Sequence, residues 1–380
     1  MQTQSMDDPM SYTTINDAAT LVVERTDDDR DSTAQQAPGR LRDKFGRAIT
    51  DLRVSVTDRC NFKCVYCRTG NEGAQYAELP IADYLRMVRR FVSLGVEKIR
   101  LTGGEPLLRS GLLEMVSELA KIRTVYRADG TEILHGAQGR PLDIALTTNG
   151  HLLEGLAQPL KDAGLNRITV SMDAVDAATF AKITRVPRSF DRVLTGIRRA
   201  KAVGLGPVKV NCVLLRGFND GQIEQFAEFS RREGVIVRFI EFMPLEEDRS
   251  WKPETVIRMD EVVDRLNAYR PLVELAPNSA SETARRFTFD DGVGEIGIIA
   301  PVSRPFCGQC SRVRLTSDGK IRTCLFSQSD HDLYGEMLRG GTDEELDAYI
   351  RNVVMRKEAR HHIGEPGFQK PSRNMVHIGG

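Results

Sequence analysis

Six of the seven cysteines fall into two groups of three. The first group is Cys60, Cys64 and Cys67, with the spacing C-x3-C-x2-C, and it directly follows a predicted strand. Structural zinc usually takes four ligands from paired C-x2-C elements. Three thiolates on one loop instead suit a 4Fe–4S cluster that leaves one iron without a protein ligand. The spacing therefore predicts an iron–sulfur cluster with an iron open to a substrate or cosubstrate, and zinc is the alternative.

The second group has the spacing C-x2-C-x13-C and comprises Cys307, Cys310 and Cys324. From spacing alone, a zinc ribbon that lacks one visible ligand competes evenly with a second cluster. The histidines that could complete a zinc site are His331, His361 and His362. The seventh cysteine, Cys212, lies among Val and Leu in a predicted strand and is expected to be a small buried hydrophobic residue.

Arg312 and Arg314 lie two residues apart on a predicted strand, so their side chains face the same side. A solvated strand face is one interpretation of this pair. The other is phosphate binding, because planar guanidinium groups grip oxyanions with two hydrogen bonds at once.

Composition indicates a folded, globular chain of 380 residues, with 41% hydrophobic and 28% charged residues. No apolar run reaches the roughly 18 residues of a membrane span, and the acidic N-terminus does not resemble a secretory signal. We therefore expect a cytoplasmic protein with reduced thiols. The net charge of +0 hides eight acidic and two basic residues in positions 1–39, which are expected to form a disordered acidic tail. The remaining chain is mildly basic, which suits an anionic ligand, but its charge is too dispersed to predict nucleic-acid binding.

From Leu41 onward, short β-branched runs alternate with helical patterns, which predicts parallel strands joined by helical crossovers and hence an incomplete (βα)6 barrel. The predicted strands are 52–57, 98–102, 144–147, 167–171, 208–214 and 235–242, and the predicted helices are 81–94, 111–121, 151–163, 190–203 and 219–233. Asp129-Gly130 lies between two apolar runs and predicts an inserted hairpin over about 123–141.

The pattern changes near residue 245, where a C-terminal α+β domain covering 246–380 is expected to begin. Its predicted elements are a helix at 260–268, strands at 286–290, 293–299, 312–316 and 320–324, and a last helix that starts at a capping box of Thr342 and Glu345. That helix is expected to bury Leu346, Tyr349, Ile350, Val353 and Val354.

Two motifs together resemble the radical S-adenosylmethionine superfamily: the first cysteine group, and Gly103-Gly104-Glu105-Pro106 at the end of the second predicted strand. Alone, the second motif could be a tight turn. Further segments are similar to the GTP 3′,8-cyclase family of molybdenum cofactor biosynthesis, over about residues 40–380. They are DLRVSVTDRCNFKCVYC, KIRLTGGEPLLR, LTTNG, AGLNRITVSMDAV, VRFIEFMP, FCGQCSRVRLTSDGKIRTCLF and the terminal Gly379-Gly380.

The resemblance implies a TIM-type partial barrel, residues 40–245, with a C-terminal cluster-binding domain. It also implies a lyase that uses two 4Fe–4S clusters and S-adenosylmethionine to cyclise GTP to (8S)-3′,8-cyclo-7,8-dihydroguanosine 5′-triphosphate. The implied partners are GTP, a flavodoxin- or ferredoxin-like electron donor and cyclic pyranopterin monophosphate synthase, which would receive the product. The implied protein binds no nucleic acid or membrane, and the family pattern is compatible with a homodimer.

The same resemblance assigns roles to individual residues. The first cluster is implied at Cys60, Cys64 and Cys67, and the second, which binds the guanine base, at Cys307, Cys310 and Cys324. The S-adenosylmethionine pocket is implied at Tyr66, Gly104, Ser171 and Met243. The GTP contacts are implied at Arg53, Arg100, Thr147, Lys209, Arg312, Val313 and Arg314, and Gly379 and Gly380 are implied to support radical initiation. Arg238 is a further candidate for a phosphate contact.

Two other classes of protein were considered. A twin-cluster peptide-modifying radical enzyme usually has more C-terminal cysteines than the three present here, and it lacks the arginine set. A zinc-stapled nucleotide-binding regulator would use the second cysteine group as a structural site.

Overall fold

The computed structural model describes residues 39–67, 74–127, 130–133, 139–246 and 251–379 of the chain. Residues 39–379 belong to one compact unit. Asp129, most of the acidic tail and Gly380 lie outside the described residues. None of the helices in the described ranges combines the length and apolarity needed to cross a bilayer.

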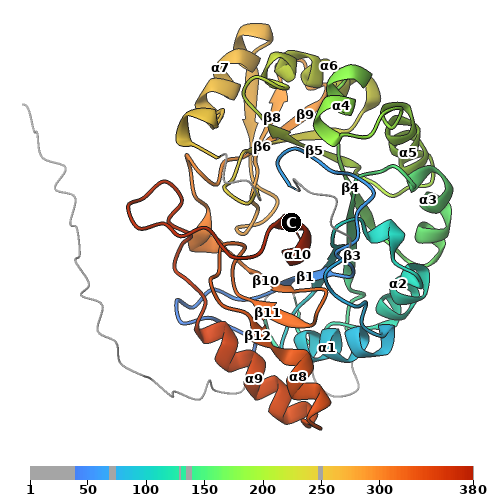
Figure 1. Ribbon diagram of the computed structural model, residues 1–380, viewed down its shortest axis with the longest axis vertical. Helices are drawn as coiled ribbons and strands as arrows, with labels where there is room; N and C mark the ends of the chain where they lie inside the picture. Colours follow the sequence, from blue (N-terminus) through green and yellow to red (C-terminus); the bar gives the residue numbers. More distant parts are fainter. Residues whose placement is uncertain (1–38, 68–73, 128–129, 134–138, 247–250, 380) are drawn as a thin grey trace, which may run out of the picture. The chain divides into compact units, whose positions relative to one another are not determined.

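A curved sheet of twelve strands forms the frame of the unit (Figure 1). Six parallel strands follow one another in chain order: β1 (Asp51–Ser55), β2 (Lys98–Thr102), β3 (Asp143–Thr148), β4 (Arg167–Ser171), β5 (Lys209–Leu214) and β6 (Ile236–Glu241). These are the six strands that the sequence predicted: two have the predicted ends, and the ends of the others are shifted by at most two residues. Their alternation with helices confirms the expected incomplete (βα)6 barrel.

The C-terminal part adds a parallel strand to each edge of this six-stranded core. β10 (Arg312–Leu315) pairs with β1, and β9 (Glu295–Ile299) pairs with β6. Antiparallel strands then extend both edges: β11 (Lys320–Arg322) and β12 (His331–Asp332) beyond β10, and β8 (Arg285–Phe289) and β7 (Leu272–Leu275) beyond β9. The strands that follow residue 245 therefore continue the same sheet.

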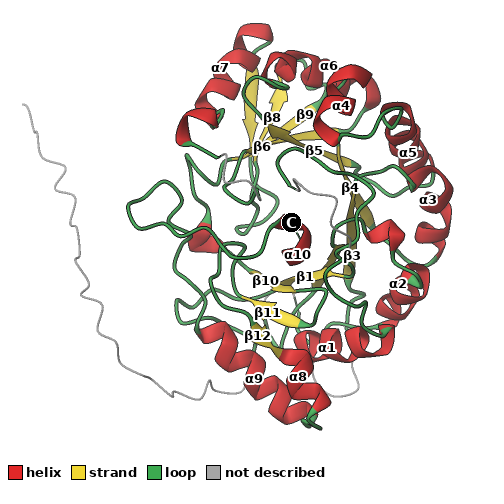
Figure 2. Cartoon of the chain, viewed as in Figure 1, coloured by secondary structure: helices red, strands yellow, loops and turns green. Residues whose placement is uncertain are grey.

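Helices cover the convex side of the sheet, and the strands line its concave side (Figure 2). The helices on the convex side are α1 (Ile81–Ser93), α2 (Leu112–Lys121), α3 (Leu153–Asp162), α4 (Ala177–Thr184), α5 (Phe190–Ala202), α6 (Ile223–Glu233), α7 (Met259–Tyr269), α8 (Leu333–Leu338) and α9 (Asp343–Met355), whereas the short helix α10 (Met375–Ile378) lies on the concave side. Their apolar faces pack on the alternate strand residues that point outward, and Cys212 is fully buried in this core, as expected. The polar residues on the concave side are thereby left to face one another.

Several elements were not predicted from the sequence. The sequence patterns predicted no helix at 177–184, yet α4 forms there because Asp176 accepts hydrogen bonds from the amides of Ala178 and Thr179. β7, β12, α8 and α10 were also missed, and each has at most six residues. α9 begins at the predicted capping box, but Tyr349 is only partly buried, in contrast to the expectation. The inserted hairpin is represented by bridges from Arg123 to Pro141 and from Tyr126 to Glu132.

Candidate active site

A cavity of about 290 Å³ lies on the concave side of the sheet. All six cysteines of the two groups line it, and none of them is in a disulfide. Three come from the loop after β1 and three from the segment between β9 and β12. Groups that are about 240 residues apart in the sequence therefore face one enclosed space.

The loop with the first cysteine group is held against α4. The Lys63 amide donates to the Thr184 carbonyl at 3.1 Å, and the Val65 amide donates to the Ile183 carbonyl at 3.0 Å. The Phe62 ring packs edge-on against Phe180. The loop is therefore braced by protein contacts at residues between its cysteines.

The Gly103-Gly104-Glu105 segment packs directly on the start of the same loop. The Gly104 amide donates to Thr57 at 2.8 Å and the Glu105 amide to Arg59 at 2.7 Å. A Cβ on Gly104 would lie 2.3 Å from the Arg59 carbonyl oxygen, so no other residue fits there without a shift of backbone. The glycine is required by this close approach.

The Glu105 carboxylate connects this turn to the end of β3. It accepts hydrogen bonds from the Thr148 hydroxyl at 2.6 Å and the Asn149 amide at 2.7 Å. The Asn149 side chain in turn donates to Asn61 in the cysteine loop at 2.7 Å. Burial raises the pKa of Glu105 to about 7. The network fixes three loops relative to one another.

All four residues implied to bind S-adenosylmethionine, namely Tyr66, Gly104, Ser171 and Met243, line the cavity. The Tyr66 hydroxyl donates to Asp173 at 2.7 Å, and the other Asp173 oxygen accepts from the Val213 amide at 2.8 Å. Burial raises the pKa of Asp173 to about 6. Asp173 thus fixes the orientation of Tyr66 from the end of β4.

The second cysteine group lies beside two cations. Arg312 Nη2 donates to Cys310 Sγ at 3.3 Å. Lys357 Nζ is fixed by the Arg312 carbonyl at 2.9 Å. Burial disfavours the Cys310 thiolate, but Arg312 and Lys357 outweigh it, so its pKa falls to about 6. The protein therefore favours a thiolate ligand at this position.

The donor chemistry fits clusters at both groups, because each offers three thiols outside disulfides that line the same cavity. Burial is the main cause that raises the pKa of Cys64 well above its usual value, and the charges of Asp173, Cys67 and Cys60 raise it further. The three thiols of the first group therefore interact with one another. Among the described residues, no three His, Cys, Asp or Glu side chains are grouped tightly enough for one metal ion. Of the histidines considered as a fourth ligand, His361 lines the cavity and His362 is exposed beside Glu365, whereas His331 pairs with Ile321 between β11 and β12.

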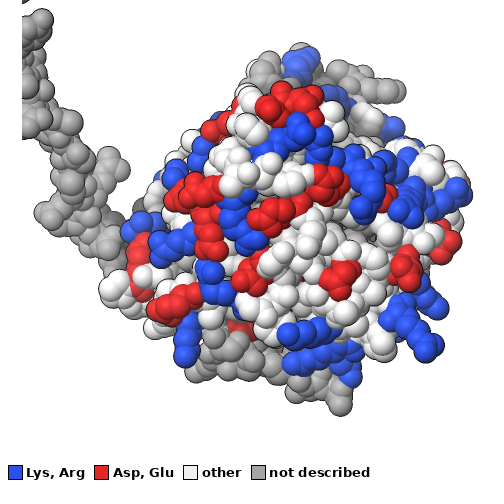
Figure 3. Space-filling model, turned by 90° about the horizontal axis from the view of Figure 1, so that it is seen from above, with Lys and Arg blue, Asp and Glu red and all other residues white. Residues whose placement is uncertain are grey.

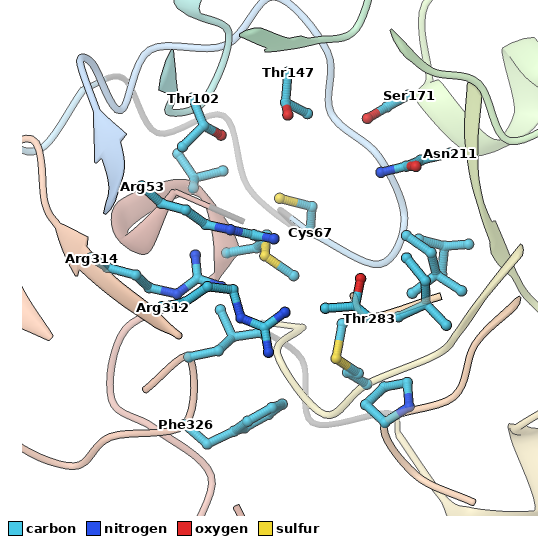
Figure 4. A pocket seen from close by; sticks show the side chains of 18 of the residues that line it. Arg53, Cys67, Thr102, Thr147, Ser171, Asn211, Thr283, Arg312, Arg314 and Phe326 are labelled. Carbon is cyan, nitrogen blue, oxygen red and sulfur yellow. The ribbon is translucent and has the colours of Figure 1, made fainter. Parts of the chain in front are cut away.

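Arg53, Arg312 and Arg314 point their guanidinium groups into the cavity, and Thr147, Ser171 and Asn211 lie across from them (Figure 4). The strand register places Arg314 beside Arg53, and Arg53 beside Arg100. Burial lowers the pKa of Arg53 well below its usual value, and the charges of Arg314, Arg100 and Arg312 lower it further. A cluster of mutually repelling buried cations needs a polyanion.

The other residues implied to bind GTP do not all line the cavity. Thr147 lines the cavity, and Arg100 Nη1 donates to its hydroxyl at 3.3 Å. Lys209 and Arg238 belong to neighbouring strands and lie outside the lining, with pKa values lowered to about 8 and about 9 by burial and by nearby cations. The Val313 side chain is buried in the core on the opposite strand face from the two arginines.

The C-terminal segment ends inside the curve of the sheet (Figure 1). Met375 and Val376 line the cavity, and Arg314 donates to the carbonyls of Ile378 and Gly379. Arg373 anchors the segment through two 2.8 Å hydrogen bonds to Asp318 and an ion pair with Asp330 at 2.6 Å.

Several cavity residues were not assigned from the sequence. They include Thr102, Asn149, Asp173, Asn211, Thr283, Phe326 and Lys357. Asn149 and Asp173 belong to the quoted segments LTTNG and SMDAV, so their place after a strand was a usable signal. Thr283 comes from the loop between β7 and β8, and no local pattern marks it.

Comparison with known proteins agrees with this site. Residues 54–230 match the radical SAM superfamily, and residues 235–363 match the family Molybdenum Cofactor Synthesis C. The fold is shared with Streptococcus suis SuiB, whose crystal structure has S-adenosylmethionine bound; the TM-score is 0.56 at 14% identity, covering 87% of this chain and 77% of that one. The chain is a radical SAM protein with a TIM-type partial barrel.

Two relatives define the family more narrowly. The GTP 3′,8-cyclase of Mycolicibacterium smegmatis is 42% identical over 94% of this chain and 97% of its own length. That of Acidothermus cellulolyticus is 41% identical over 83% of this chain and 85% of its own length. The chain belongs to the GTP 3′,8-cyclase family, and the cofactors of this family are 4Fe–4S clusters and S-adenosylmethionine.

Proposed function

We propose that this protein cyclises GTP to (8S)-3′,8-cyclo-7,8-dihydroguanosine 5′-triphosphate, the first step of molybdenum cofactor biosynthesis. The observation that carries the proposal is the meeting of two cysteine groups and a buried arginine cluster on one cavity. A nucleoside triphosphate matches both ends of such a site, because its phosphates suit the arginines and its base suits a second metal cluster.

In this proposal Cys60, Cys64 and Cys67 hold the first cluster. Tyr66, Gly104, Ser171 and Met243 bind S-adenosylmethionine. When bound, these cofactors would supply a 5′-deoxyadenosyl radical that takes the 3′ hydrogen of GTP. Bonding of the 3′ carbon to C8 would then need one further electron and a proton to give the dihydro product. The protein orients the reacting groups and keeps water from the radical.

Cys307, Cys310 and Cys324 would hold the second cluster, and with it the guanine base. The triphosphate would be bound by the guanidinium groups of Arg53, Arg312 and Arg314, which already converge. Further contacts are assigned to Arg100, Thr147, Lys209, Val313 and Arg238. Val313 would contribute through its backbone, since its side chain is in the core.

Gly379, which lies on the concave side of the sheet, and Gly380 would support radical initiation. The residues 40–245 would form the radical SAM part and 246–380 the cluster-binding part. We also propose a low-potential protein as electron donor, cyclic pyranopterin monophosphate synthase as recipient of the product, and a cytoplasmic location, where cluster thiols stay reduced.

The test is an anaerobic reaction of reconstituted protein with GTP, S-adenosylmethionine and dithionite. We expect 5′-deoxyadenosine and the cyclised nucleotide in equal amounts, together with iron and acid-labile sulfide in the protein. Bound zinc with GTP binding, but without either product, would instead favour the nucleotide-binding regulator.

A further inference from the structure

Five exposed cations lie on the loop that carries the first cysteine group and on the segment from α4 to the start of α5, whose α4 residues bond to that loop. We call them the basic collar: Lys63, Lys182, Arg185, Arg188 and Arg192. Within positions 177–192 the single acidic residue is Asp191. The face seen in Figure 3 carries several groups of basic side chains, with acidic side chains between them.

Two residues of the basic collar lie where the cysteine loop contacts α4. Lys63 is itself a loop residue, adjacent in sequence to Cys64, and its amide donates to the Thr184 carbonyl at 3.1 Å. Arg185 is the next residue after Thr184. The collar therefore marks the place where the cysteine loop reaches the protein surface.

A second connection runs through aromatic rings. Arg192 lies 3.4 Å from the His151 ring. The His151 ring packs edge-on against Phe62, with centroids 5.7 Å apart. Phe62 is in the cysteine loop, between Cys60 and Cys64. The collar is therefore linked to the cysteine loop both by the backbone hydrogen bond of Lys63 and by the packing of His151 on Phe62.

Two of the collar residues have an unusual backbone. Arg185 and Arg188 adopt φ of 57° and 59°, the left-handed region that favours glycine. Arg185 ends α4 at a position where glycine is the common choice. In the described part of the chain, neither arginine forms an ion pair. Two arginines therefore occupy backbone positions that favour glycine, and no ion pair within the described residues accounts for them.

We propose that the basic collar is the docking surface for an acidic one-electron carrier protein that reduces the first cluster. The inference rests on the proposed function, because that reaction needs one electron for each S-adenosylmethionine cleaved. The carrier would lose one electron and the cluster would gain it, with no proton or other group transferred. An acidic carrier is specified because the collar carries five positive charges, and Asp191 is the single acidic residue within positions 177–192.

The expected complex is small and transient. Electron-transfer encounters bury little surface, and steering by opposite charges raises association rates by 10- to 1,000-fold. Such steering weakens as salt rises, because charges beyond about 10 Å are screened at 0.1 M ionic strength. The collar should therefore act on association with the donor and leave the chemistry in the cavity unchanged.

The experiment compares Arg185→Glu/Arg188→Glu with the wild-type protein, using a purified bacterial flavodoxin as the probe. We expect binding of oxidised flavodoxin and the stopped-flow rate of hydroquinone oxidation to fall at least tenfold at low salt. Dithionite-driven product formation should stay within twofold. The variant Arg185→Gly/Arg188→Gly removes both charges while relieving the backbone, and should show a smaller loss with an intact fold.

The matched control is Arg89→Glu on the exposed side of α1, which covers another part of the sheet (Figure 1). Equal effects of the Arg89 variant and the collar variants would overturn the proposal, as would unchanged flavodoxin binding in both collar variants. If the wild-type protein forms no product even with dithionite, the proposed function fails. The binding comparison would still decide the docking surface in that case, since it does not depend on turnover.

Discussion

Replacing Gly379 with alanine tests whether the position of the C-terminal segment matters for turnover. Gly379 has φ of 66°, in the left-handed region. An added Cβ would lie 2.8 Å from Thr102 Cγ2 and 3.1 Å from Ser55 Cβ. Both neighbours are buried, so they have little room to move. The substitution should therefore displace the segment from Arg314, which donates to the Gly379 carbonyl.

The size of the effect follows from two costs. A non-glycine residue in the left-handed region costs roughly 1–2 kcal/mol, and crowding of a packed site adds about 1 kcal/mol or more. A total of about 2–3 kcal/mol shifts the ratio of docked to released segment by about 30- to 150-fold. We expect turnover to fall at least tenfold, whereas GTP affinity should change less than threefold because the cavity arginines remain.

The assay is product formation under saturating GTP and S-adenosylmethionine, with GTP affinity and melting temperature measured on the same preparation. Gly367→Ala is the control, because Gly367 has φ of 84° but nothing within 4 Å of its added Cβ. That variant should keep nearly full turnover. Full activity in Gly379→Ala would refute the reasoning, since the crowded position would then have no bearing on the reaction.

Three other outcomes are expected. Cys64→Ala should abolish 5′-deoxyadenosine formation under dithionite, measured by chromatography, and normal cleavage would contradict the cluster assignment. Replacing all three of Cys307, Cys310 and Cys324 by alanine should about halve the iron content of the protein, while the first cluster stays visible by electron paramagnetic resonance. Loss of zinc instead of iron would indicate that the second cysteine group forms a zinc ribbon. Arg373→Met should destabilise the fold at neutral pH by about 1–2 kcal/mol. Burial alone would raise the Asp318 pKa, but Arg373 and Thr316 outweigh burial and lower it to about 2. A lowered folded pKa stabilises the protein above the unfolded value of 3.8 and loses that effect as pH falls towards 2, so the difference from wild type in urea unfolding should shrink over that range.

The sequence predicted the six central strands well because each is a short apolar run with a turn signal at its end. Cys60, Gly104 and Ser171 could be placed at strand ends for the same reason, and all three line the cavity. The short elements were missed because a helix such as α10, with four residues, has too few positions for a period to show. The position of α10 depends on the hydrogen bonds between Arg373 and Asp318, which are 55 residues apart in the sequence.

Side-chain partners across strands were beyond the reach of local patterns. The sequence places Arg312 and Arg314 on one face, but it does not show which strand lies beside them. The pairing of β10 with β1, which brings Arg314 beside Arg53, joins residues about 260 positions apart. Similarly, Asp173 was missed because its role depends on Tyr66 and Val213, which come from other βα units.

This pairing also explains why the two matched regions of the chain form one site. Arg53 lies next to the start of the radical SAM match at residue 54, and Arg312 and Arg314 lie within the region matched at 235–363. Since β10 extends the sheet beside β1, the arginine cluster is built across the contact between the two regions. Arg53 thus comes from the first strand of the barrel, and Arg312 and Arg314 come from the strand that extends the sheet beside it. The three-arginine cluster is complete only because β10 pairs with β1.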